Sequence, residues 1–83
     1  MEIKVLGVGC PNCQALEREV YNALAELGIA ASVQKVKDLE EITKHGVFAT
    51  PALVVNGKVK AAGRVPSRAE LKRIIQREAA SAG

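Results

Sequence analysis

Aromatic side chains are nearly absent from this chain of 83 residues: Tyr21 and Phe48 are the only two, and there is no tryptophan. Proteins that bind single-stranded nucleic acid stack its bases on aromatic rings, and aromatic cages bind quaternary ammonium groups. The scarcity of such rings argues against both functions, and we expect no nucleic-acid partner.

Long apolar runs are missing as well. No stretch approaches the ~20 residues of a transmembrane helix, and the start, Met1-Glu2-Ile3-Lys4, lacks the basic and apolar regions of a signal peptide. Hydrophobic residues make up 48% of the chain and charged residues 25%, which is typical of a globular protein. We therefore expect one soluble, cytoplasmic domain over residues 1–78 with no membrane partner, and a frayed tail over residues 79–83.

Positive charge is concentrated near the C-terminus. Residues 1–63 contain seven basic and seven acidic residues, so the net charge of +3 comes entirely from residues 64–83. Such a segment could bind an acidic partner or nucleic acid. Because it contains no run of like charges and no interleaved aromatics, we interpret it as the solvated face of a helix.

Three segments carry helix signals. An apolar stripe at helical spacing begins after Pro11, which suits a first helical position, and ends before Gly28, so the pattern predicts a helix over residues 11–27. A second, short helix is expected to end at Gly46. Two capping boxes mark the starts of the second and last helices: Asp38 with Glu41, and Ser67 with Glu70.

Four segments have the pattern of strands: residues 2–6, 31–36, 52–55 and 58–61. The third is apolar on both faces, as in a central strand, and Asn56-Gly57 after it is a strong hairpin signal. The fourth alternates polar and apolar residues, as an edge strand does. The order β-α-β-α-β-β-α predicts an α/β fold with a four-stranded mixed sheet. The right-handed crossover rule places the first and last helices on one face and the middle helix on the other.

The motif Cys10-Pro11-Asn12-Cys13 contains both cysteines of the chain, too few for a disulfide framework. Two thiols this close at a helix start can form a disulfide, and Pro11 and Asn12 shape the loop between them. The unpaired N–H groups and the positive end of the helix favour the Cys10 thiolate, which lowers its pKa. We predict that Cys10 is the nucleophile and that Cys13, more buried, resolves the mixed disulfide.

Other functions are compatible with two thiols. A C-x-x-C motif is also half of a zinc site, so a soft-metal carrier for copper or zinc is an alternative, and a protein with passive cysteines is a third. The only histidine, His45, is distant in sequence and is interpreted as a cation at a helix end. The position of the motif at a strand-to-helix junction favours dithiol redox chemistry, without a cofactor or bound metal.

Thr50-Pro51 directly precedes the third strand, where a proline is tolerated because it need not donate to the sheet. Together with the C-x-x-C motif, this arrangement resembles the thioredoxin fold in its minimal form. The resemblance is strongest to the small thioredoxin-like redox-active disulfide proteins, which are glutaredoxin-sized. The stretches that carry it are Ile3-Lys4-Val5-Leu6-Gly7, Gly9-Cys10-Pro11-Asn12-Cys13, Gly46-Val47, Thr50-Pro51-Ala52-Leu53-Val54, Gly57-Lys58-Val59 and Gly63-Arg64-Val65-Pro66.

The resemblance implies a protein thiol–disulfide oxidoreductase. Pro51 would be a cis-proline that faces the cysteines, and Thr50 would offer its backbone to a bound substrate chain. The implied partners are disulfide-containing proteins and an electron donor, either a thioredoxin-reductase-like enzyme or another reductant. We expect the protein to act as a monomer.

The chain also departs from the families it resembles. Thioredoxins have a tryptophan before the first cysteine and a buried carboxylate in the preceding strand, whereas this chain has Gly9 and, near the place of the carboxylate, Lys4. Lys4 is expected to be solvated; if buried, it could influence thiol ionisation. The glutathione motif of glutaredoxins is missing, and Gly63-Arg64 stands there instead, with Arg64 able to bind a carboxylate.

The two aromatic residues are interpreted first as packing residues. Phe48 is expected in the core, although with Val47 and Ala49 it could instead frame an apolar docking surface around Cys10. Tyr21 lies beside the apolar stripe of the first helix and is expected to pack there.

Overall fold

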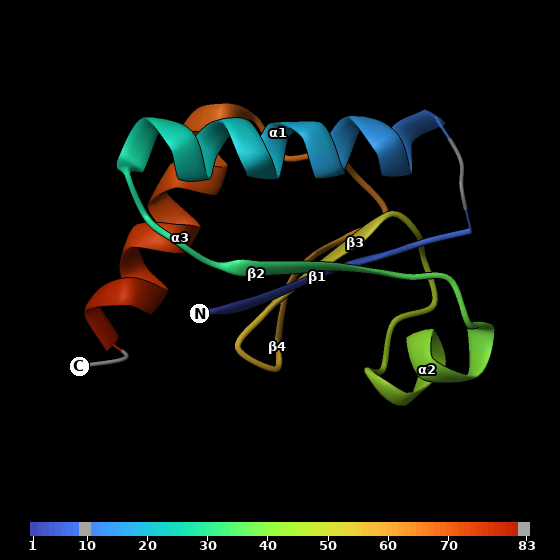
Figure 1. Cartoon of the computed structure of the whole chain (residues 1–83). Coiled ribbons are helices and arrows are strands. Elements are labelled where there is room, and N and C mark those ends of the chain that lie inside the picture. The colour runs from blue at the N-terminus through green and yellow to red at the C-terminus, as the bar shows by residue number, and fades with distance from the viewer. Residues whose placement is uncertain (9–10, 82–83) are drawn as a thin grey trace.

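A computed structural model describes residues 1–8 and 11–81 of the chain. Cys10, the predicted nucleophile, lies outside the described residues, as do Gly9, Ala82 and Gly83. The strands are β1 (Glu2–Leu6), β2 (Ser32–Val36), β3 (Ala52–Val55) and β4 (Lys58–Ala62), and the helices are α1 (Pro11–Leu27), α2 (Leu39–Lys44) and α3 (Arg68–Ser81) (Figure 1). The predicted order of elements is confirmed, with strand ends that differ from the prediction by one residue.

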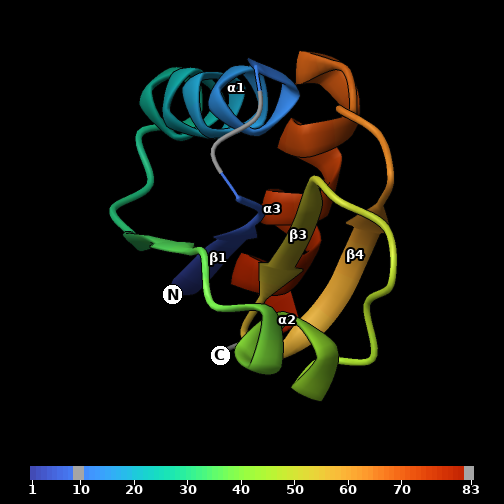
Figure 2. The ribbon, with the colours of Figure 1, turned by 90° about the vertical axis from the view of Figure 1, so that its right-hand side faces the viewer.

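The strands form one sheet in the order β2-β1-β3-β4. β1 and β2 are parallel, while β3 is antiparallel to both β1 and β4. Helices α1 and α3 lie on one face of this sheet and α2 on the other, which Figures 1 and 2 show from two sides. The predicted α/β fold, with its mixed sheet and this division of the helices between the two faces, is therefore confirmed.

The core consists of two clusters, one on each face of the sheet. The larger cluster joins β1, β3 and β4 to α1 and α3, and the smaller one joins the sheet to α2. In the larger cluster Ile3, Val5, Leu16, Val20, Ala23, Leu24, Leu53, Val55, Ala61, Leu71 and Ile75 are buried, and in the smaller one Leu6, Val36, Ile42, Val47, Ala52 and Val54. Successive residues of a strand point to opposite faces, so a central strand such as β3 is apolar throughout.

A β-bulge interrupts the edge strand. The register passes from Val54 opposite Val59 to Leu53 opposite Ala61, so Lys60 is the extra residue. The bulge returns Ala61 to the face of Leu53, where it is buried in the larger cluster. The regular alternation expected for this strand therefore holds only up to Lys60.

Helix α3 continues through Ser81, three residues beyond the predicted domain end at residue 78, and the fraying of residues 79–83 stays a prediction. Glu78 explains the difference, because its side chain is held against the β3–β4 hairpin. The carboxylate lies 3.1 Å from the ammonium of Lys60 and 3.5 Å from that of Lys58, and it accepts a hydrogen bond of 3.3 Å from Asn56 Nδ2. Alanines follow Glu78, and alanine is the best helix former.

The basic C-terminal segment makes specific ion pairs with α1, which the prediction of a solvated face did not include. Arg68 donates to Glu19 at 3.1 Å and to Glu26 at 2.9 Å, and the Lys72 ammonium lies 3.1 Å from Glu26. Hydrogen bonds from Arg68 lower the pKa of both glutamates. Exposed pairs of this kind contribute little free energy each, but they favour one alignment of α3 along α1.

The helices of the described residues are too short or too polar to span a lipid bilayer.

The buried carboxylate of Glu78 makes stability depend on pH. Hydrogen bonding to Lys60 lowers the pKa of Glu78 in the folded protein. The unfolded chain therefore binds a proton at a higher pH than the folded chain, so this contribution is present above the ordinary glutamate pKa and disappears as the pH falls through the lowered folded value. We expect Glu78→Gln to lower the free energy of unfolding at pH 7 and to flatten its decline in acid.

Denaturant unfolding between neutral and acidic pH measures this effect. Glu41→Gln, which changes an exposed carboxylate on α2, is the matched control and should leave the profile almost unchanged. An equal effect of the two substitutions at every pH would contradict the prediction.

Candidate active site

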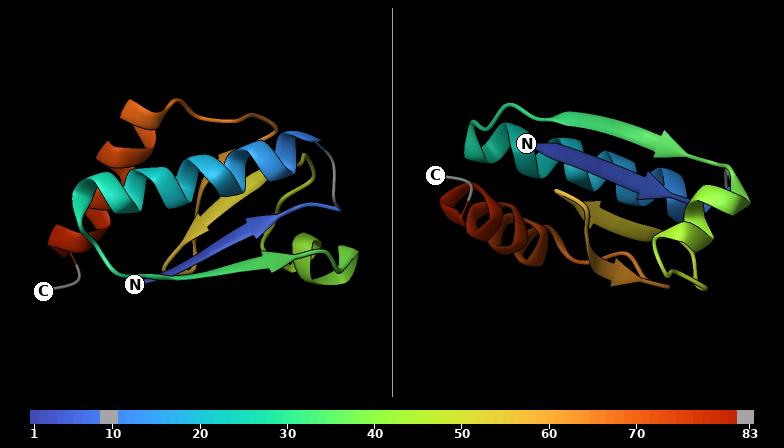
Figure 3. Two further views of the ribbon diagram at one scale, coloured as in Figure 1. Left: turned by 45° about the horizontal axis from the view of Figure 1, so that its top comes forward. Right: turned by 90° about the horizontal axis from the view of Figure 1, so that it is seen from below.

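Four elements meet at one end of the sheet. Leu6, the last residue of β1, lies opposite Val36 at the end of β2 and opposite Ala52 at the start of β3. The Gly7 N–H continues this pairing and donates to the Val36 carbonyl at 2.9 Å. The end of β1, the end of β2, the segment before β3 and the first turn of α1 are consequently close together (Figures 1 and 3).

Cys13 lies in the first turn of α1. Its side chain is 7% exposed and is disulfide-bonded, and the only other cysteine of the chain is Cys10, outside the described residues. Pro11 occupies the first helical position, as predicted, and Pro11 and Asn12 are exposed. The roles assigned to Cys10 and Cys13 in exchange remain predictions.

Gly7 leaves the space that Cys13 needs. A Cβ atom added at Gly7 would overlap the Cys13 Sγ, would lie 3.3 Å from the Cys13 Cβ, and would lie 3.9 Å from the Cβ of Thr50. This glycine therefore allows a close approach, and the side chains of Cys13 and Thr50 both lie next to it at the end of β1. The sequence prediction named Gly7 only within the stretch Ile3-Lys4-Val5-Leu6-Gly7; its position between a strand and the cysteine motif was the available signal.

The Thr50–Pro51 peptide bond is cis, the geometry that the family resemblance implies for this position. Pro51 is buried, Thr50 is exposed, and the Pro51 carbonyl accepts a hydrogen bond of 2.9 Å from the Gly63 N–H. Gly63 has a φ of 75°, and a Cβ there would lie 3.1 Å from that of Ala49. Gly63 thus supports the loop that carries the cis bond, and no contact to a ligand is needed to explain it.

Arg64, a candidate carboxylate ligand, binds a carboxylate of this chain. Its guanidinium donates two parallel hydrogen bonds to Glu70, of 2.9 and 2.6 Å. Hydrogen bonding to Arg64 lowers the pKa of Glu70. The Glu70 N–H donates to the Ser67 hydroxyl oxygen at 3.2 Å, so one half of the predicted capping box is present while the carboxylate faces Arg64.

The expectation that Phe48 belongs to the core is wrong. Phe48 is 89% exposed, whereas Val47 before it is 2% exposed and fills the smaller core cluster. Burial of Val47 in this cluster is followed by three exposed residues, Phe48, Ala49 and Thr50, so the exposed side of this loop begins at Phe48. Tyr21 is also half-exposed rather than packed.

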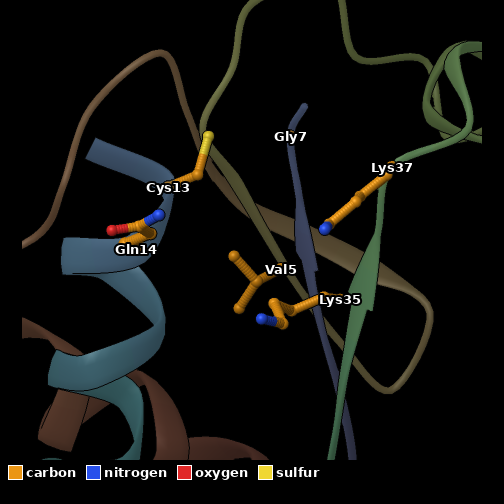
Figure 4. Close-up of a pocket in the computed structure, with 6 residues that line it drawn as sticks. All are labelled: Val5, Gly7, Cys13, Gln14, Lys35 and Lys37. Carbon is orange, nitrogen blue, oxygen red and sulfur yellow. The ribbon is translucent and has the colours of Figure 1, made fainter. Parts of the chain in front are cut away.

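A pocket of about 50 Å³ adjoins Cys13 (Figure 4). Its wall combines the end of β1, the first turn of α1 and the end of β2. The lining residues are Val5, Gly7, Cys13, Gln14, Lys35 and Lys37. In the part of the chain that the structure describes, no acidic residue is in this wall, and both charged residues are cations that the sequence interpretation did not select.

Lys4 lies on the other face of the sheet. Val5 lines the pocket beside Cys13, and the adjacent Lys4 points the opposite way. Lys4 is paired in register with Val54 of the α2-side cluster, and its ammonium lies 3.8 Å from Glu2. The suggestion that Lys4 could influence thiol ionisation is therefore not supported by its position; Lys35 and Lys37 occupy the relevant side.

His45 caps the C-terminus of α2. Its backbone N–H donates to the Ile42 carbonyl at 3.2 Å, and the Gly46 N–H donates to the Thr43 carbonyl at 2.9 Å. Within residues 1–8 and 11–81, no three histidine, cysteine, aspartate or glutamate side chains are grouped as metal ligands would be.

The close approach at Gly7 has a measurable consequence. Gly7→Ala should lower the free energy of unfolding of the oxidised protein by about 1–3 kcal/mol, a typical cost of overpacking. The loss should be smaller after reduction, because a free Cys13 thiol can rotate away from the added methyl group. Denaturant unfolding with and without a reductant measures both values.

Gly28→Ala is the control for this experiment. Gly28 has a φ of 67° and open space around its Cβ position, so its substitution strains the backbone without a steric contact. Its cost should not depend on the redox state. A Gly7→Ala loss that is the same in both redox states would refute the steric argument.

Comparison with known proteins agrees with this geometry. The family model described as "Thioredoxin domain" matches residues 1–76. A protein named thioredoxin from Methanothermobacter thermautotrophicus is 44% identical over 75 residues, which cover 90% of this chain and 97% of that protein. One from Methanocaldococcus jannaschii, also named thioredoxin, is 39% identical over 70 residues, or 84% of this chain and 80% of that one.

A solved structure shows the same fold at lower identity. Thioredoxin 1 from Thermosipho africanus superposes with a TM-score of 0.68 at 20% identity, covering 99% of this chain and 98% of that chain. The family match extends over the strand end, the cysteine motif and the Thr50–Pro51 segment. The chain belongs to the thioredoxin family and is a thioredoxin-like redox protein.

Proposed function

We propose that this protein is a dithiol–disulfide oxidoreductase that reduces or exchanges disulfides of other proteins through Cys10 and Cys13. The observation that carries the proposal is the disulfide-bonded Cys13 in the first turn of α1, which meets the cis Thr50–Pro51 segment at Gly7. A buried sulfur is poorly placed to attack a large substrate. This burial supports Cys10 as the nucleophile and Cys13 as the resolving thiol.

The proposed reaction has two exchange steps. The Cys10 thiolate attacks one sulfur of the substrate disulfide, forms a mixed disulfide, and releases the other substrate sulfur as a thiolate. The Cys13 thiolate then attacks the Cys10 sulfur, which breaks the mixed disulfide, releases the second substrate thiolate and forms the Cys10–Cys13 disulfide. Two electrons pass to the substrate, and a dithiol donor or a reductase of the thioredoxin-reductase type returns them with two protons.

Thr50 supports binding of an extended substrate chain. It is exposed, precedes the buried Pro51, and lies next to Gly7, as Cys13 does. A substrate strand that pairs with the Thr50 backbone would have its disulfide held near the cysteine motif. The substrates are therefore proposed to be proteins or peptides with an accessible disulfide in an extended segment.

Serine substitutions test the assignment of the two thiols. Cys10→Ser should reduce dithiol-dependent reduction of a protein disulfide to the background rate, because no thiolate can start the exchange. Cys13→Ser should accumulate a mixed disulfide with the substrate, which non-reducing electrophoresis and mass spectrometry detect. If the variant with both serines reduces the substrate as fast as the natural protein, the proposed function is wrong.

Phe48 gives a second test, since an exposed phenylalanine two residues before Thr50 is suited to contact a protein substrate. Phe48→Ser should raise the KM for a protein disulfide on the order of tenfold, because one aromatic contact contributes about 1–2 kcal/mol to binding. The rate with a small disulfide, which does not reach this side chain, should not change.

Tyr21→Ser is the matched control, because Tyr21 is 51% exposed and lies on α1 away from the cis bond. This variant should leave both substrates unaffected. An unchanged KM in Phe48→Ser, with the protein folded, would exclude Phe48 from substrate binding.

A further inference from the structure

The pocket beside Cys13 is too small for a substrate. Its volume of about 50 Å³ admits a few water molecules, whereas ligand pockets commonly measure about 300–1,000 Å³. Groups that line such a pocket are separated by very little solvent. Any effect of this pocket on the chemistry must therefore come from interactions among the residues that line it, which include Cys13 and two lysines.

The two lysines differ in their partners. The Lys35 ammonium lies 3.7 Å from the carboxylate of Glu17, one turn along α1 from Cys13, so part of its charge is balanced. Lys37 follows the end of β2 and forms no ion pair with any described residue. Figure 4 shows its side chain turned from β2 toward β1, with the nitrogen beside β1 between Val5 and Gly7.

Other charges near this end of the sheet are directed elsewhere. Lys4 lies on the opposite face, and the Arg64 guanidinium is occupied by Glu70. Asp38, next to Lys37, accepts a hydrogen bond from the Glu40 N–H and caps α2. The pocket wall contributes only uncharged groups from β1, and Thr50 before β3 is also uncharged. Lys37 is thus the unbalanced charge at the pocket among the described residues.

We propose that Lys37 is a positioning residue that stabilises the thiolate of Cys13 electrostatically and so promotes the resolving step. This inference rests on the proposed function and specifies how its second step is assisted. Burial of Cys13 disfavours its charged form, and a nearby cation favours it. Lys37 acts through its positive charge and does not remove the thiol proton, which leaves to water.

The test uses Cys10→Ser as the parent, so that Cys13 is the only thiol. Ultraviolet absorbance of the thiolate, followed against pH, gives the pH at which half of Cys13 is ionised. Adding Lys37→Met should raise this midpoint and lower the thiolate fraction at pH 7 by roughly threefold to tenfold, where tenfold corresponds to a shift of about one pH unit. Lys37→Arg, which keeps the charge, should stay close to the parent.

Lys44→Met is the matched control, because it removes an exposed lysine from α2 that does not line the pocket. It should leave the midpoint unchanged, and the Lys37→Met shift should shrink in concentrated salt, which screens exposed charges. In the protein with both cysteines, Lys37→Met should slow release of the second thiol from a preformed mixed disulfide by a similar factor.

The inference is overturned if Lys37→Met and Lys44→Met give the same midpoint as the parent, or if Lys37→Arg shifts it as far as Lys37→Met. Its failure can be distinguished from failure of the proposed function. The titration requires no substrate, whereas the proposed function fails if the natural protein does not reduce a protein disulfide, whatever the titration gives.

Discussion

The close approach between the end of β1 and the first turn of α1 determines the rest of the site. Gly7 both continues the pairing of β1 with β2 through its N–H and leaves room for the Cys13 sulfur on its open side. Antiparallel pairing of Leu6 with Ala52 brings the cis bond to the same place. A side chain at position 7 would separate the Cys13 sulfur from the segment that is proposed to bind substrate. The disulfide and the cis bond could each still form, but no longer next to one another.

The architecture was predictable because its signals are local and agree with one another. Pro11 and Gly28 bound α1, Asn56-Gly57 marks the hairpin, and apolar residues on both faces identify β3 as central. The crossover rule then fixes which helices share a face. The end of α3, by contrast, depends on contacts of Glu78 with residues about twenty positions earlier, which no local pattern contains.

The sequence predicted the reactive residues of the site, but not the residues that surround them. The cysteine motif and Thr50-Pro51 are visible as residue types at characteristic positions. Either Val47 or Phe48 could fill the small core under α2, and the sequence pattern does not decide between them. Val47 fills it in the structure, which leaves Phe48 exposed. The nearness of Lys37 to Cys13 follows from the parallel pairing of β1 with β2, whose register the sequence does not specify.

The hairpin end of the sheet lies opposite the site. There Asn56 donates its N–H to Glu2 and accepts from the Glu2 N–H through its side chain, while Glu78 binds the hairpin from α3. β1 therefore begins, and α3 ends, at the end of the molecule that lies away from the first turn of α1, which carries Cys13 (Figure 1). Affinity tags, fluorescent labels or fused domains attached through either end would leave the redox surface sterically accessible.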